Sequence, residues 1–162
     1  MMRFAHPAPR SHVPTPDQIA AVRAAVLAAF DGVPLPPGSE IALHPCDEYA
    51  GIRAAFAGQD WRAMPPALIE AHALALPLLS PRAYPYFLGA YLLYALDHFE
   101  LSGPTEYLVY NLAPDVPRHA DQAGWHAEHL RHVTAGQLAA IDAFMELVAA
   151  DEGFTYYLDD LI

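Results

Sequence analysis

The chain has 162 residues and is 54% hydrophobic, which suits one compact domain with a full apolar core and no need for disulfides. Its formal net charge of −11, from 19 acidic and 8 basic residues, argues against nucleic acid and anionic membranes as partners. Cys46 is the only cysteine and the N-terminus lacks an apolar signal region, so we expect a cytoplasmic protein without an internal disulfide.

The N-terminal part of the chain divides into an arm and a helix. Residues 1–14 are rich in proline and lack periodicity, so we expect an extended arm, with a single helical domain over residues 15–162. Thr15 and Gln18 have the spacing of a capping box at the start of the first helix. Gly32 should end that helix.

The next segment is broken repeatedly by proline and glycine. Residues 40–44 have the pattern of one short strand, and we expect at most one small strand pair in the whole chain. Helices are predicted from about residue 45 to 57 and from about residue 65 to 76, where Pro77 interrupts the pattern.

The most hydrophobic segment predicts a central helix over residues 85–99, after a short turn at 81–84. This helix is apolar on every side, which is typical of a helix buried all around. Its uncharged run, residues 83–96, is shorter than the roughly 20 residues that a membrane span needs. The expected fold is therefore mainly α, with about six helices around this buried helix.

The C-terminal third contains one ambiguous element and one clear helix. Residues 105–112 fit either a short helix or a strand, and we favour the helix. Residues 114–124 look like a polar loop. Thr134 and Gln137 form a second capping-box pattern, which predicts a last long helix that begins directly after Thr134. The segment that precedes Thr134 should therefore lie outside this helix.

The order of motifs resembles an uncharacterised family of small bacterial proteins, a domain of unknown function. The resemblance covers roughly residues 17–148 and is carried by "IAAVRAAVLAAFDGVPLP", "FAGQDWRAMP", "LLSPRAYPYFLGAYLLYAL" and "HVTAGQLAAIDAFMELV". The family pattern is "LSP.a..YFLPAYL" followed by "LT..Q..ai..FL". Gly89 stands where the pattern has proline, and Val133 where it has leucine. The resemblance implies no activity and assigns no site residues.

The clearest candidate for a metal site is "WHAEHLRH", residues 125–132. His126 and His129 can share one helix face, but a third histidine three residues further on drifts away from it. Nearby residues that would complete a site are His119, Asp121, Glu128 and His132. The common zinc motifs HExxH and HxxEH are absent. We therefore expect a solvated helical turn, with a metal site at His126 and His129 as the alternative.

Two further groups of residues are candidates for chemical sites. Cys46 lies two residues after His44, a potential base, but Asp47 and Glu48 oppose thiolate formation, so we expect a partly buried structural cysteine. Four tyrosines of the central segment are expected in the core, with hydroxyls bonded at its edge. They are Tyr84, Tyr86, Tyr91 and Tyr94.

The sequence predicts a non-catalytic soluble protein that acts by binding another protein, an acidic inhibitor of a basic protein being one form of this. No catalytic residue, cofactor or metal is assigned. The alternative is a metal-binding protein or enzyme that uses the region of His126 and His129.

Overall fold

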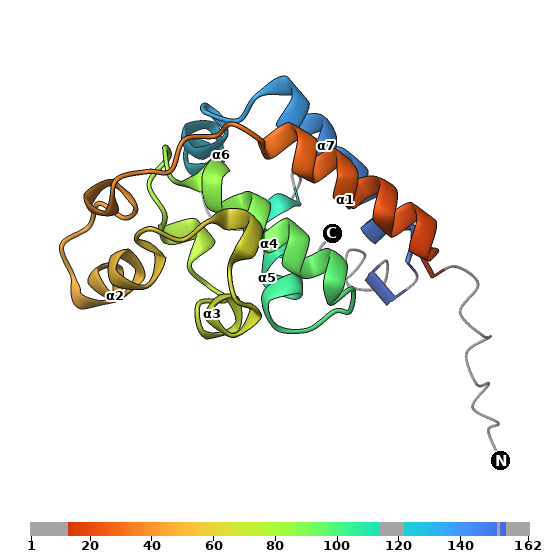
Figure 1. Ribbon diagram of the computed structural model, residues 1–162, viewed down its shortest axis with the longest axis horizontal. Coiled ribbons are helices and arrows are strands. Elements are labelled where there is room, and N and C mark those ends of the chain that lie inside the picture. Colours follow the sequence, from red (N-terminus) through yellow and green to blue (C-terminus); the bar gives the residue numbers. More distant parts are fainter. Residues whose placement is uncertain (1–12, 114–121, 152, 155–162) are drawn as a thin grey trace, which may run out of the picture.

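The computed structural model describes residues 13–113, 122–151 and 153–154. Within these residues the chain forms seven α-helices and no strand, so the predicted mainly α class is confirmed (Figure 1). The helices are α1 (Pro16–Phe30), α2 (Asp47–Phe56), α3 (Pro66–Ala71), α4 (Tyr84–Asp97), α5 (Gly103–Leu112), α6 (Gln122–Leu130) and α7 (Ala135–Ala150). Three 3₁₀ turns join them: η1 (Gly38–Glu40), η2 (Trp61–Ala63) and η3 (Leu76–Leu78). None of these helices is long and apolar enough to span a membrane.

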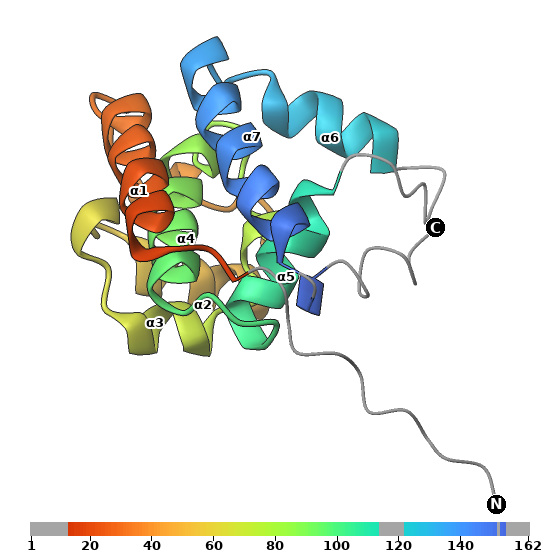
Figure 2. The same ribbon diagram turned by 90° about the vertical axis from the view of Figure 1, so that its right-hand side faces the viewer.

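α4 is the centre of the fold. Every residue from Tyr84 to Leu96 is buried, as expected for a helix that is apolar on all sides. α1, α3, α5, α6 and the turns η2 and η3 pack directly against it. Figures 1 and 2 show α4 in the middle of the molecule, with α1 and α7 side by side along one flank.

The flanking helices α1 and α7 begin with the two predicted capping boxes. The Gln18 backbone N–H donates to the Thr15 hydroxyl at 3.2 Å, and the Thr15 N–H donates to the Gln18 side chain at 2.8 Å. Thr134 and Gln137 repeat this arrangement at 3.2 and 2.9 Å. Both boxes satisfy backbone donors that a helix start otherwise leaves without a partner.

Trp61 packs its ring against α4 at Gly89. The tryptophan is 2% exposed, and its ring centroid lies 6.1 Å from that of Phe30 in α1. A Cβ placed on Gly89 would lie 2.7 Å from Cε3 of Trp61, closer than van der Waals contact allows. Glycine at this position therefore lets the indole approach the α4 backbone.

The predicted strand at residues 40–44 is wrong. The Ser80 N–H donates to the carbonyl of Ile41 at 2.7 Å, and the Arg53 guanidinium donates to the carbonyls of Ala42 and His44 at 2.7 and 2.8 Å. A serine and an arginine from elsewhere in the chain therefore take the carbonyls that a strand partner would need.

Other boundaries also differ from the predictions. α3 ends at Ala71 instead of Leu76, because the chain turns at His72, whose N–H bonds the carbonyls of both Leu68 and Ile69. The ambiguous segment 105–112 is helical and belongs to α5. The predicted loop 114–124 is too long, because α6 already begins at Gln122. Residues 114–121 of that loop and 1–12 of the predicted arm lie outside the described residues.

Candidate functional site

His129 is buried at the interface between α6 and α4. It is 6% exposed, and its Nε2 lies 2.9 Å from the backbone oxygen of Leu79. Because a carbonyl oxygen only accepts, Nε2 must carry the proton that it donates. The imidazole also meets the ring of Tyr84 edge-on, at 5.4 Å between centroids. The expectation of a solvated turn is thus wrong for His129, which anchors α6 to the core.

His126 lies one turn before His129 and is half-buried. Burial lowers its pKa below the ordinary value, and the nearby charge of His129 lowers it further. Glu128 and His132 are exposed, while His119 and Asp121 lie outside the described residues. Across the described part of the chain, no group of three His, Cys, Asp or Glu is placed to hold a metal ion. The described candidate ligands therefore form no three-residue metal site, although His126 and His129 lie close enough to influence each other.

Cys46 occupies the N-cap position of α2 and is exposed, so the expectation of a partly buried cysteine is wrong. Its side chain makes no cap hydrogen bond. Its backbone N–H donates to Nδ1 of His44 at 3.3 Å, and the His44 ring packs near Tyr49. His44 is therefore bonded to the backbone of Cys46.

The tyrosines of the central segment are core residues, as predicted. Tyr86 donates to the carbonyl of Gln59 at 3.0 Å, and Tyr94 donates to a carboxylate oxygen of Glu70 at 3.0 Å. Tyr91 donates to the carbonyl of His72. Burial raises the pKa of Tyr84 and Tyr91 above the ordinary value, so both hydroxyls stay protonated.

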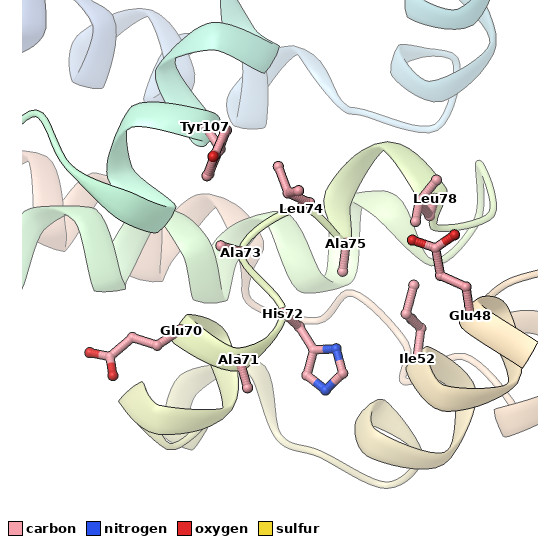
Figure 3. A pocket seen from close by; sticks show the side chains of 10 residues that line it. All are labelled: Glu48, Ile52, Glu70, Ala71, His72, Ala73, Leu74, Ala75, Leu78 and Tyr107. Atoms are coloured by element: carbon pink, nitrogen blue, oxygen red, sulfur yellow. The ribbon is translucent and has the colours of Figure 1, made fainter.

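A pocket of about 380 Å³ lies between α2, α3, η3 and α5. Its apolar wall consists of Ile52, Ala71, Ala73, Leu74, Ala75 and Leu78. Its polar residues are Glu48, Glu70, His72 and Tyr107. Figure 3 shows Glu48 on one side of the pocket and Glu70 on the other, with Leu74 and Tyr107 at its upper rim. We call this hollow the α2–α3–α5 pocket.

Two properties of the α2–α3–α5 pocket suit it to binding a partner. The carboxylates of Glu48 and Glu70 have no cationic partner within the described residues, although Glu70 accepts the Tyr94 hydroxyl. Leu74 is 58% exposed and Tyr107 is 40% exposed. The sequence predicted that Leu74 lies within a helix over residues 65–76. α3 instead ends at Ala71, three residues before Leu74, and Leu74 is exposed.

A second pocket, of about 350 Å³, lies where the segment after η1 meets the turn before α4 and the end of α6. It is lined by Glu40, Leu43, Ser80, Pro81, Arg82, Glu128, Arg131 and His132. We call it the charged pocket, because five of these eight side chains can carry charge. Glu128 and His132, two of the residues proposed to complete a metal site, line this pocket instead.

The sequence matches a known protein-family model. The model described as "Family of unknown function (DUF6714)" matches residues 19–155, which is most of the chain. Neither the curated proteins nor the solved structures gave a match.

Proposed function

Because the chain belongs to this family of unknown function, which assigns no activity, we propose a function from the chain's own surface: it binds a basic segment of another protein in the α2–α3–α5 pocket. The observation that carries this proposal is the pairing of Glu48 and Glu70, which lack cationic partners in the described structure, with an exposed leucine and tyrosine.

The apolar residues of the pocket favour a protein over a small polar ion. Leu74 and Tyr107 are large side chains whose apolar surface is left in water, and such surface favours association when a partner covers it. Tyrosine is also among the residue types that carry most energy at protein interfaces. A segment with more than one basic side chain, interspersed with apolar residues, would pair with a carboxylate on each side of the pocket and cover the apolar rim.

The charge of the whole chain supports the same class of partner. A formal charge of −11 attracts a basic protein over distances near the Debye length and repels acidic ones. His72 forms part of the pocket wall and has a structural role there. Its ring packs edge-on against Phe56, and its carbonyl accepts the Tyr91 hydroxyl. A non-catalytic, inhibitor-like protein fits this surface.

The alternative of a metal-binding protein or enzyme rests on His126 and His129. One ring nitrogen of His129 already bonds the backbone of Leu79, which leaves a weaker basis for this alternative than for the pocket. Metal analysis of untagged protein tests it. Stoichiometric metal that disappears in His126→Ala would favour the alternative over the binding proposal.

The binding proposal is tested by affinity capture from the native host with three baits, followed by titration of the captured protein. The pocket variant is Glu48→Gln/Glu70→Gln, in which the amide oxygen that replaces the Glu70 carboxylate can still accept the Tyr94 hydroxyl. The matched control is Asp142→Asn/Glu146→Gln, which removes the same two charges from exposed positions of α7. A basic protein should bind the wild type and the control, and should bind the pocket variant about tenfold more weakly.

A Tyr107→Ala variant tests the apolar half of the pocket and should also weaken binding by about tenfold. The proposal fails if the captured protein is acidic, or if the control variant loses as much affinity as the pocket variant.

A further inference from the structure

The arginines of this chain divide into two groups. All eight basic residues are arginine, and five of them fall within the described residues. Arg23 pairs with Asp97, Arg62 pairs with Asp31, and Arg53 donates to two backbone carbonyls. Arg82 and Arg131 have no acceptor in the described structure, and both line the charged pocket.

The residues around the charged pocket are held in place from two sides. The Ser80 hydroxyl donates to the carbonyl of Glu40 and accepts the Ala83 N–H at 3.1 Å. On the other side, His129 fixes α6 to the carbonyl of Leu79 at 2.9 Å. Three segments far apart in the sequence thus form one hydrogen-bonded frame. The backbone that carries the pocket residues therefore needs little reorganisation when a ligand binds.

The charges in the charged pocket select one class of ligand. Two guanidinium groups without acceptors suit a carboxylate, which arginine binds through paired hydrogen bonds. Glu40 and Glu128 line the same pocket and have no cationic partner in the part of the chain that the structure describes. These carboxylates repel a dianion such as phosphate and attract an amino group. Leu43, 67% exposed, and Pro81 add apolar surface.

We infer that the charged pocket binds a free α-amino acid with an apolar side chain. Arg82 and Arg131 hold its carboxylate, a glutamate faces its ammonium group, and Leu43 with Pro81 contacts its side chain. This site is separate from the α2–α3–α5 pocket and does not depend on the protein-binding proposal.

The inference is tested by titrating isotope-labelled protein with leucine and following backbone amide shifts by NMR. The shifts should map to residues 40–43, to Ser80 and Arg82, and to residues 128–132. Arg82→Gln and Arg131→Gln should each weaken binding by about tenfold, because each removes hydrogen bonds to a charged group. The matched control is Arg62→Gln, which removes one guanidinium outside this pocket and should leave the affinity unchanged.

Four further probes define the ligand class: inorganic phosphate, the acid that corresponds to leucine without its amino group, the amine without its carboxyl group, and a leucine dipeptide. Leucine should bind more tightly than each of them. Tighter binding of phosphate or dipeptide, equal binding of the acid or the amine, absence of shifts at these residues, or wild-type affinity in both arginine variants would overturn the inference.

Discussion

At the scale of single residues, Gly89 is a close packing constraint in the core. The buried ring of Trp61 occupies the space that a Cβ would fill, with only 2.7 Å to the nearest ring carbon. Gly89→Ala should therefore force the indole or the α4 backbone to shift and lower the free energy of unfolding by about 1–3 kcal/mol. Urea unfolding followed by far-UV circular dichroism measures this change.

Gly51 provides the matched control, because it also lies inside a helix but has open space where a Cβ would stand. Gly51→Ala should raise the free energy of unfolding by about 0.5–1 kcal/mol, since alanine favours the helix. Equal stabilisation by the two substitutions would show that the Trp61 ring does not restrict position 89.

His129 shows why single functional residues are hard to assign from sequence. Its spacing relative to His126 suggests ligands, yet its actual partner is the carbonyl of Leu79, fifty residues earlier in the chain. A local pattern contains no information about such a distant acceptor. Both pockets were missed for the same reason, because each is lined by segments that meet only in the folded chain.

At the scale of elements, α1 and α7 depend on their capping boxes. Thr15→Ala and Thr134→Ala should each lower the free energy of unfolding by about 1 kcal/mol, because each leaves a backbone N–H at the helix start without its acceptor. Thermal and urea unfolding measure both. Ser39→Ala is the control, since η1 has no side-chain cap and the change should stay within about 0.5 kcal/mol. A loss in Ser39→Ala as large as that in the threonine variants would argue against the caps.

The attachment of α6 should respond to mild acid through His126. The pKa of His126 is lower in the folded protein than its ordinary value of about 6.5, so the unfolded chain takes up the proton first. Stability from this group is present above about pH 6.5 and declines as pH falls below it. His126→Gln should therefore have a melting temperature that depends less on pH than that of the wild type, measured by calorimetry across this range. Parallel pH profiles would contradict the assignment.

The helices that were predicted correctly are those whose own residues carry the pattern that defines them. α1 and α7 follow their capping boxes, and α4 follows its apolar surface on every side. The errors fall where tertiary contacts decide. Residues 40–44 lose the predicted strand because Arg53 and Ser80 bond their carbonyls, and α3 stops early at His72.

At the scale of the whole molecule, charge should control solubility. Each of the nine histidines gains one positive charge when it is protonated. Protonation of all nine would change the formal net charge from −11 to −2 and remove most of the repulsion between molecules. We predict a solubility minimum near pH 5, in line with a sequence pI of about 5.0. Precipitation assays across the acidic range measure it, and constant solubility from about pH 8 to 5 would contradict it.

The contact between α1 and α7 has a consequence for how the protein is made. α1 is the first described helix to leave the ribosome and α7 is the last long one, yet they pack against each other beside α4. During translation, the apolar faces of α1 and α5 that pack against α7 must wait for it before they are covered. The nascent chain is therefore most exposed to aggregation and chaperone binding just before α7 emerges.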